Sequence, residues 1–510
     1  MENYLVTRDA ETHPKRSTLT RSSALAVGVA TLLASSVFRQ ALGFFTLAFT
    51  ARLLRPEDFG IIAYFMIAVA LLEMLQRQIG LVLIRIHEVT TEHLNTVFTF
   101  QLVFGFFAAF VFWAIQPLVA ILKIPQLGEI LPYLSILSIL ISFRSPRFLL
   151  YERSLRFSQA AVEETLNRVA YSAAALYMVW LWRDFWAVLA AVFVGMGVRS
   201  TITFAIAPML PRLSVSRWRE CLAFSSWSVG AQLSQFLANN MPQLFIGATL
   251  GLADAGLYRV GTRITEVVTT HFIAPLQRVI YPGLADVARS TDRKREAFIR
   301  LNALLLAIVL PVSVGTALVC KDVILVGLGY KWIAAAQVIW VLAPLKAMET
   351  LQANVRAASY VAGSTKTLFV RNLILLILSF TYMWVGTRFG FGGALAASGM
   401  SSLTALFITL ILAKNFGSGS FWEPITVAWR SFIACIIMAI AVLLTDFLLR
   451  SGTHAPRLLV IVLVKIFVGI IVYTVTHIAL WAFARRPDGF ETSVFTLLRR
   501  FGRKIKQSQI

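Results

Sequence analysis

The chain has 510 residues, of which 58% are hydrophobic and 14% are charged, and its mean hydropathy is +0.75. This composition excludes an ordinary soluble protein and predicts an all-α membrane protein that crosses the bilayer many times. The formal net charge of +22 comes from short basic clusters between apolar runs. That pattern is typical of cytoplasmic membrane loops, so nucleic acid is not an expected partner. The three cysteines lie far apart, at no spacing typical of a metal or redox site.

About fourteen apolar segments reach the length of roughly twenty residues that a membrane-spanning helix needs. A polar basic arm, residues 1–23, precedes them, and a basic tail, residues 485–510, follows them. In chain order the predicted spans are 24–51, 58–84, 94–119, 130–150, 160–182, 186–210, 222–250, 256–284, 298–320, 332–361, 368–387, 393–413, 431–449 and 458–484.

Lys and Arg are distributed unequally between alternate connections of these spans. With the N-terminus inside, the inner connections and the two termini hold 28 of the 47 basic residues, and the outer connections hold 9. Basic residues accumulate on the cytoplasmic side of membrane proteins. Both termini are therefore predicted to be cytoplasmic.

The remaining ten basic residues fall inside predicted spans, where a central charge costs about 2.5–3.5 kcal/mol on insertion scales. They are Arg39, Arg77, Arg168, Arg199, Arg259, Arg263, Arg278, Lys346, Arg356 and Lys465. The clear acids at comparable depth are Glu73, Glu266 and Glu349, so the excess is cationic. Such residues are expected to face the bundle interior, a partner charge or a water-filled cavity.

Some of these charges have a structural explanation. Arg278 and Arg356 lie near cytoplasmic ends and are expected to extend toward the membrane surface along their apolar stems, and Arg199 is expected to do so less easily. The spacing of Glu164 and Arg168 predicts an ion pair on one helix.

A functional role is favoured more strongly for two further charge pairs and for Arg39. The spacings Glu73–Arg77 and Lys346–Glu349 predict ion pairs that either join helices or act in function. Arg39 lies near the centre of its span, with no acid at helical spacing, so a purely local explanation does not account for it.

Two predicted helices present polar faces. Arg259, Arg263 and Glu266 share one face of the eighth span. In the seventh span four neutral polar residues follow one stripe, at positions Gln232, Gln235, Asn239 and Gln243. The stripe predicts either a hydrated lumen or a polar seam between helices.

A weak internal repeat suggests the domain organisation. "ARLLRPEDFGIIAY" at residues 51–64 and "GATLGLADAGLYRV" at residues 247–260 match at a spacing of 196 residues, including Gly60 with Gly256. Because an even number of spans separates them, the two halves would be parallel repeats. Residues 24–210 and 221–413 are thus predicted as six-span lobes, 211–220 as a cytoplasmic linker, and 414–484 as two appended spans with the preceding loop.

Residues 51–85, "ARLLRPEDFGIIAYFMIAVALLEMLQRQIGLVLIR", resemble the opening signature of bacterial polysaccharide-export flippases, in which an apolar helix ends in a "-LL-P--FG" turn. Residues 149–164, "LLYERSLRFSQAAVEE", and 328–345, "LGYKWIAAAQVIWVLAPL", resemble later parts of that family. It belongs to the multidrug/oligosaccharidyl-lipid/polysaccharide exporter superfamily. The resemblance implies an inner-membrane protein whose two lobes alternate between inward-open and outward-open states. It also implies a cationic lumen for an undecaprenyl-pyrophosphate-linked oligosaccharide.

The resemblance also implies roles for single residues, because essential arginines of the lipid II flippase lie in its first, second and eighth spans. Loosely by position, these correspond to Arg39, Arg77 and Arg259 or Arg263. The expected pyrophosphate ligands are Arg259, Arg263, Arg39, Arg77 and Lys346. Sugar hydroxyls are expected to meet Gln232, Gln235, Asn239 and Gln243. Charge balance or coupling to H⁺ or Na⁺ is expected of Glu73, Glu266 and Glu349. No other cofactor is expected.

Other functions remain open from the sequence. A drug or cation antiporter of the same superfamily would carry more acidic than basic charge in its cavity, and a lipid II-type flippase would share the architecture. A membrane glycan polymerase or ligase would need catalytic residues on a large outer loop, whereas the predicted outer connections are short, so no enzyme is expected. Residues 493–507 predict either an amphipathic helix on the inner leaflet or a disordered anchor. Besides the lipid bilayer, glycan synthesis and polymerase proteins are candidate partners.

Overall fold

The computed structural model describes residues 18–86, 88–121, 125–154, 157–222, 226–267, 291–361, 365–413, 422–451 and 458–484. These residues are almost entirely helical, and no β-strand occurs among them. The protein is therefore an all-α polytopic membrane protein, as its composition predicts. Seven stretches of the described residues are long and apolar enough to cross a membrane.

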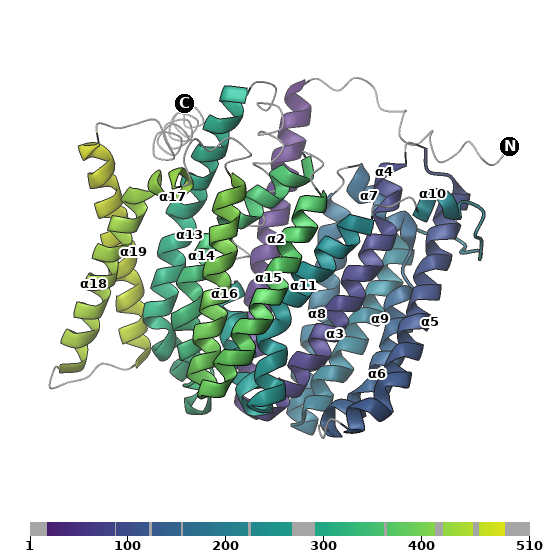
Figure 1. Ribbon diagram of the computed structural model, residues 1–510, viewed down its shortest axis with the longest axis horizontal. Coiled ribbons are helices and arrows are strands. Elements are labelled where there is room, and N and C mark those ends of the chain that lie inside the picture. Colours follow the sequence, from purple (N-terminus) through teal and green to yellow (C-terminus); the bar gives the residue numbers. More distant parts are fainter. Residues whose placement is uncertain are drawn as a thin grey trace, which may run out of the picture. The chain divides into compact units, whose positions relative to one another are not determined.

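The described helices fall into two compact units, Met1–Gly256 and Leu257–Ile510. In the first unit (Figure 1) the helices are α2 (Thr18–Leu53), α3 (Pro56–Gly80), α4 (Val82–Arg85), α5 (Thr91–Ile121), α6 (Pro125–Ser142), α7 (Leu149–Arg153), α8 (Phe157–Trp182), α9 (Phe185–Ile206), α10 (Trp218–Leu222) and α11 (Ser226–Thr249). A 3₁₀ turn, η1 (Pro146–Phe148), precedes α7. Helix α3 packs against α5, α6, α9 and α11, so it forms the core of this unit.

The second unit contains α13 (Thr291–Gly327), α14 (Ala335–Val361), α15 (Thr365–Gly386), α16 (Gly390–Ala413), α17 (Glu423–Thr426), α18 (Trp429–Ser451) and α19 (Leu458–Phe483). Here α13 packs against α14, α18 and α19, and α16 packs against α14 and α15. A further helix, residues 252–267, crosses the boundary between the two units in the sequence.

Each predicted span overlaps one of these helices, and several ends differ by a few residues. In two cases the prediction runs past the point where the helix stops. The fourth span was expected to reach residue 150, whereas α6 ends at Ser142. Pro146 follows, and the residue before a proline is disfavoured in helical conformation, so the chain leaves the helix and re-enters it as η1 and α7. The sixth span was expected to reach residue 210, whereas α9 ends at Ile206, just before Pro208.

The compact units do not divide at the predicted linker, residues 211–220. Helix α11, the predicted first span of the second lobe, packs against α3 in the first unit. The assignment of lobes to residues 24–210 and 221–413 stays a prediction.

The matched glycines of the internal repeat lie against each other. A Cβ atom on Gly60 would collide with the carbonyl oxygen of Leu252, and one on Gly256 would collide with the carbonyl oxygen of Pro56. The turn before residue 252 depends on Gly251, whose φ of 107° is unfavourable for other residues. Helix α3 and the start of the helix at 252–267 therefore cross with their backbones in close contact.

The predicted cytoplasmic connections of the first unit meet at one end. Arg153 Nη1 donates to the carbonyl oxygen of Ile86 at 2.6 Å, and Arg147 Nη1 donates to that of Pro208 at 2.9 Å. The Tyr151 hydroxyl donates to the carbonyl oxygen of Ile206 at 3.2 Å. Since the turns near Pro56 and Leu252 also lie together, alternate connections are segregated as the distribution of basic residues predicts.

Candidate functional site

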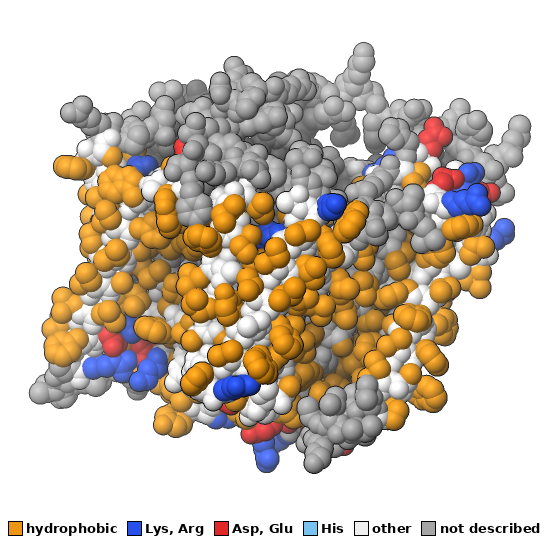
Figure 2. All heavy atoms as spheres, viewed as in Figure 1, with side chains coloured by type: hydrophobic (Ala, Val, Ile, Leu, Met, Phe, Trp, Pro, Cys, Tyr) orange, Lys and Arg blue, Asp and Glu red, His pale blue; other side chains and the backbone are white. Residues whose placement is uncertain are grey.

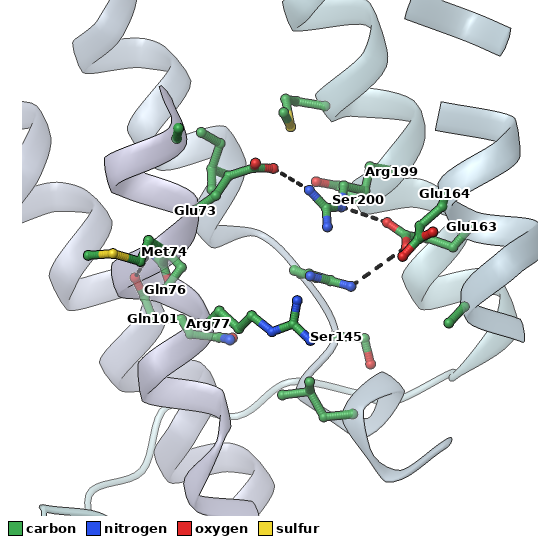
Figure 3. A pocket seen from close by; sticks show the side chains of 16 residues that line it. Glu73, Met74, Gln76, Arg77, Gln101, Ser145, Glu163, Glu164, Arg199 and Ser200 are labelled. Carbon is green, nitrogen blue, oxygen red and sulfur yellow. Dashed lines mark hydrogen bonds and ion pairs between the residues drawn. The ribbon is translucent and has the colours of Figure 1, made fainter. Parts of the chain in front are cut away.

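The first unit contains a charged pocket of about 350 Å³. Its walls come from α3, α5, α6, α8, α9 and the segment between α6 and α7 (Figure 3). Three arginines and three glutamates line it: Arg77, Arg144, Arg199, Glu73, Glu163 and Glu164. The pocket is therefore balanced in charge, in contrast to the cationic excess expected from the sequence.

Arg199 is the centre of the ion pairs in this pocket. From α9 it donates through Nε to Oε1 of Glu163 on α8 at 2.6 Å, and it also pairs with Glu73 on α3. Arg144 lies 3.8 Å from the second oxygen of Glu163. The Glu163 side chain is 3% exposed, so these arginines supply the positive charge that its burial requires.

Two sequence-based expectations about these arginines are wrong. Arg199 does not extend to the membrane surface, because it binds carboxylates inside the helix bundle. Arg144, counted with the cytoplasmic loops, lines the pocket. The early end of α6 at Ser142 places Arg144 beyond the helix, where its side chain reaches α8.

Arg77 and Arg39, both expected pyrophosphate ligands, lie in or beside this pocket. Arg77 lies one turn after Glu73 on α3 and points into the pocket (Figure 3). Arg39 on α2 pairs with Glu164 at 2.9 Å and donates to the Thr165 hydroxyl at 3.2 Å. The acid that Arg39 lacks on its own helix therefore comes from α8, and the expected partner of Arg168 is engaged by Arg39.

The neutral wall of the pocket has unused hydrogen-bonding capacity. Gln76 Nε2 donates to the Ser142 hydroxyl at 2.5 Å and to the carbonyl oxygen of Gln101 at 3.0 Å. The side-chain oxygens of Gln76 and Gln101 are buried without a hydrogen-bond partner among the described residues. Buried polar atoms in a cavity are usually satisfied by water or ligand, so this wall is suited to accept hydroxyl donors.

A second group of charges lies in the second unit. Arg263 pairs with Glu266 at 3.5 Å, and Lys346 on α14 pairs with Glu349 at 2.8 Å, as their helical spacing predicts. Glu266 also acts electrostatically on Lys346, so the two pairs form one cluster. Arg259 lies one turn before Arg263 on the same helix and is partly buried. All four side chains of the two pairs are partly exposed.

The polar stripe of α11 does not form a single hydrated row. Gln232 accepts a hydrogen bond from Gln78 Nε2 of α3 at 2.7 Å, which is a polar seam between helices. Gln243 is buried and donates to the carbonyl oxygen of Ala255 at 2.8 Å, so it joins α11 to the next helix. Gln235 Nε2 donates to Asn239 Oδ1 at 2.8 Å, and within this stripe Asn239 is exposed while Gln235 is half-buried.

Sequence reasoning missed Arg371. It was counted as a cytoplasmic loop residue near the start of its span, but it is buried in α15. Its guanidinium donates to Thr409 Oγ1 at 2.8 Å, to Asn372 Oδ1 at 2.9 Å and to Gln352 Oε1 at 3.3 Å. The three acceptors lie on α14, α15 and α16, and no spacing in the sequence connects them.

A buried charge cluster joins α13, α18 and α19. Lys465, predicted inside its span, pairs with Asp322 at 2.8 Å and with Asp446 at 3.0 Å. Arg450 pairs with the same two carboxylates, at 2.5 Å and 3.0 Å. The spacing of Asp446 and Arg450 is a local signal, whereas Asp322 is remote in sequence. Arg278, the side chain of Arg356 and residues 493–507 lie outside what the structure describes.

Comparison with known proteins adds information on family and fold. The sequence model of the family described as "Polysaccharide biosynthesis protein" matches residues 49–337. The succinoglycan biosynthesis transport protein ExoT of Rhizobium meliloti (strain 1021) is 25% identical over 445 residues, which cover 85% of this chain and 88% of that protein. The lipopolysaccharide biosynthesis protein WzxC of Escherichia coli (strain K12) is 20% identical over 298 residues, covering 57% and 60%.

Among solved structures, the lipid II flippase MurJ in an inward-closed conformation aligns with a TM-score of 0.71. The alignment covers 89% of this chain and 99% of MurJ, at 12% sequence identity. A point mutant of the Vibrio cholerae MATE transporter VcmN aligns with a TM-score of 0.50, covering 78% of this chain and 98% of that chain at 11% identity. At these identities the likeness concerns the fold alone.

Proposed function

The chain belongs to the polysaccharide biosynthesis protein family, and on that premise we propose that it is a flippase for a lipid-linked oligosaccharide in the bacterial inner membrane. The cargo in this proposal is a repeat unit carried on undecaprenyl pyrophosphate, which the protein moves by alternating access. Export of the glycan involves no catalytic step by the protein itself. The likeness in fold to transporters is consistent with this proposal.

The charged pocket of the first unit is the observation that carries the proposal. A guanidinium group stays charged in the membrane and gives paired, charge-assisted hydrogen bonds to phosphate oxygens. Arg199 and Arg39 are already engaged by carboxylates, so a pyrophosphate would take over positions that Glu73, Glu163 and Glu164 occupy. Such an exchange lowers the net affinity for the head group, which allows a transporter to release it.

The second cluster also combines basic and acidic side chains, three to two. In this proposal Arg259, Arg263 and Lys346 contact the pyrophosphate in another step of transport, and Glu266 and Glu349 balance them. On α11, the half-buried Gln235 and the exposed Asn239 are suited to sugar hydroxyls. Coupling to H⁺ or Na⁺ would use the carboxylates of either cluster.

The equal number of arginines and glutamates in the pocket favours cation antiport as the second candidate. The two functions differ in what accumulates when the protein is absent. Loss of a flippase leaves lipid-linked repeat units in the membrane and removes exported glycan, whereas loss of an antiporter leaves glycan export intact. Both quantities are measured in a deletion strain and in the complemented strain.

The same assay tests the arginines. Arg77→Ala is expected to lower export about 10- to 100-fold at normal protein level, because one charge-assisted phosphate contact contributes about 1.5–3 kcal/mol. Arg77→Lys keeps the charge without the planar fork, so partial export is expected. Arg388→Ala is the control, since Arg388 lies over the Trp384 ring at a helix end, outside the pocket.

A double variant separates ligand binding from helix packing in the second cluster. If Arg263 only neutralises Glu266, then Arg263→Gln combined with Glu266→Gln removes both charges and should restore export. If Arg263 binds pyrophosphate, the double variant stays inactive at normal protein level. Robust export by the double variant would refute the role of Arg263.

A further inference from the structure

The segment between α9 and α11, residues 208–222, is fixed to the first turns of α5. Three of its backbone N–H groups donate to side chains of α5: Arg212 to Asn95 Oδ1 at 3.2 Å, Ser214 to Thr99 Oγ1 at 2.9 Å and Arg217 to Thr96 Oγ1 at 3.4 Å. An irregular segment lacks the regular backbone hydrogen bonds of a helix or strand. These side chains therefore accept from N–H groups that would otherwise need water. We refer to residues 208–222 as the clamped segment.

Ion pairs reinforce the same attachment. Arg217 Nε lies 3.0 Å from Glu92 Oε2, and Glu220 Oε2 lies 2.9 Å from His93 Nε2. Hydrogen bonds from His93 and Arg217 hold the pKa of Glu220 below its ordinary value, so this carboxylate stays ionised at neutral pH. Cys221 is buried beside Val97 and Leu149, which anchors the end of the segment.

The clamped segment exposes its large apolar side chains. Leu210 is 87% exposed, Leu213 74%, Val215 57% and Trp218 45%. Arg212 is exposed between Leu210 and Leu213, and Arg219 is exposed directly after Trp218, with its guanidinium 5.4 Å from the Trp218 ring centroid. Alternating apolar and cationic side chains, with one tryptophan, are typical of segments that lie in the interface of a bilayer.

One face of α5 indicates how deep the clamped segment lies in the membrane. Six residues at intervals of three and four lie on one face of the helix: Glu92, Thr96, Thr99, Val103, Phe106 and Phe110. The first three bind the clamped segment. The last three are uncovered, at 58–61% exposure, within the membrane-spanning stretch Thr91–Pro117.

An apolar, uncovered face of a membrane-spanning helix contacts lipid. Thr99 precedes Val103 by about one helical turn, roughly 6 Å of rise, so the clamped segment lies where the lipid-facing surface of α5 begins. Figure 2 shows the same order at the α5 end of the molecule, with charged side chains gathered above a band of hydrophobic ones. Leu213 and Val215 flank Ser214, whose N–H binds Thr99, so both continue this apolar surface.

We infer that the clamped segment is an interfacial lipid-binding site, with Leu213 and Val215 inserted among acyl chains and Arg212 and Arg219 bound to the phosphates of anionic phospholipids. The clamp to α5 holds these side chains at the depth of the head groups, so the segment does not need to fold on binding. Its charge complements the anionic inner leaflet. This site differs from the charged pocket, and the inference does not depend on the cargo.

The test places an environment-sensitive fluorophore on single added cysteines of the full-length protein in nanodiscs. The background keeps Cys221, Cys320 and Cys435, which are buried, and the parent protein without an added cysteine gives the label that they take up. Leu213→Cys reports on the clamped segment, Val103→Cys is the lipid-exposed control, and Ser158→Cys, an exposed residue of α8, is the water-exposed control. Because Leu213 is exposed, its substitution leaves the packing intact.

The probe at residue 213 is expected to be quenched by nitroxide-labelled lipid, as at residue 103, and protected from iodide compared with residue 158. The protection is expected to be greater in phosphatidylcholine with 30% phosphatidylglycerol than in phosphatidylcholine alone. Arg212→Gln with Arg219→Gln should abolish that difference. If iodide quenches the probe at residue 213 as strongly as the probe at residue 158, and labelled lipid does not quench it, the inference is overturned. A soluble protein would then be the remaining candidate for binding to this surface. Protection independent of phosphatidylglycerol would overturn the role of the two arginines.

Discussion

At the scale of single residues, the charges inside this protein are stabilised mainly by partners on other helices. Arg199 binds Glu163 and Glu73, Arg39 binds Glu164, and Lys465 binds Asp322. Each pair satisfies charges that the low-dielectric interior would otherwise disfavour. In this arrangement the loss of one partner costs more than the loss of both.

Arg199 gives a direct test of this statement. Arg199→Met removes the 2.6 Å partner of the buried Glu163 and leaves Arg144 at 3.8 Å. Removing one partner of a buried pair costs about 3–5 kcal/mol, so the melting temperature of the purified protein should fall clearly. Adding Glu163→Gln removes the uncompensated charge and should recover much of the loss. A double variant no more stable than Arg199→Met would contradict this role, and Arg388→Met serves as the exposed control.

The sequence predicts the local pairs and not the remote ones. Arg263–Glu266 and Lys346–Glu349 are visible because residues three apart share a helix face. The pair of Arg39 with Glu164 joins residues of α2 and α8, and it depends on how two helices pack and rotate. Amphipathic patterns fix that rotation poorly in a membrane, where both the core and the lipid are apolar.

At the scale of elements, α3 is positioned by the close crossing near Gly60. Gly60→Ala places a methyl group against the backbone carbonyl of Leu252, which cannot move aside as a flexible side chain does. Such overpacking costs about 1–3 kcal/mol, and we expect a lower melting temperature together with reduced export.

The matched control for Gly60 is a helical glycine with free space. Gly197→Ala in α9 meets no atom within 4 Å, and alanine is the better helix former by about 1 kcal/mol. This variant should be as stable as the parent protein or slightly more stable. Equal destabilisation by both substitutions would show that the crossing at Gly60 tolerates a methyl group.

Helix ends show which element boundaries can be predicted. Apolar length gave each span, but it extended the fourth across Pro146 and the sixth across Pro208, where the helices stop early. Proline was the available signal in both cases. The consequence concerns the site as well, because the end of α6 at Ser142 brings Arg144 into the pocket.

At the scale of the whole molecule, hydropathy predicts the class of protein and the order of its helices, whereas the grouping of helices needs tertiary contacts. The repeat suggests lobes at residues 24–210 and 221–413, which stay a prediction, whereas the compact units divide after Gly256. Within the first unit, five residues of α5 bind the segment that leads to α11. Nothing in the pattern of apolar residues encodes those polar contacts.

The orientation in the membrane is the last prediction, and two independent observations motivate it. Basic residues favour the predicted inner connections by 28 to 9. In the first unit the connections near Ile86, Arg153 and Pro208 also meet through hydrogen bonds at one end. Reporter fusions after Ser154 and Ser216 should therefore report cytoplasm, and fusions after Arg183 and Gly329 should report the opposite side.

The outcomes separate the number of crossings from their direction. If Ser154 and Arg183 report the same side, α8 does not cross the membrane and the count of spans is wrong. If all four fusions are inverted, the spans hold, but the basic residues do not set the orientation. An inverted protein would also place Arg212 and Arg219 away from the anionic inner leaflet, so the lipid site on the clamped segment requires the orientation predicted here.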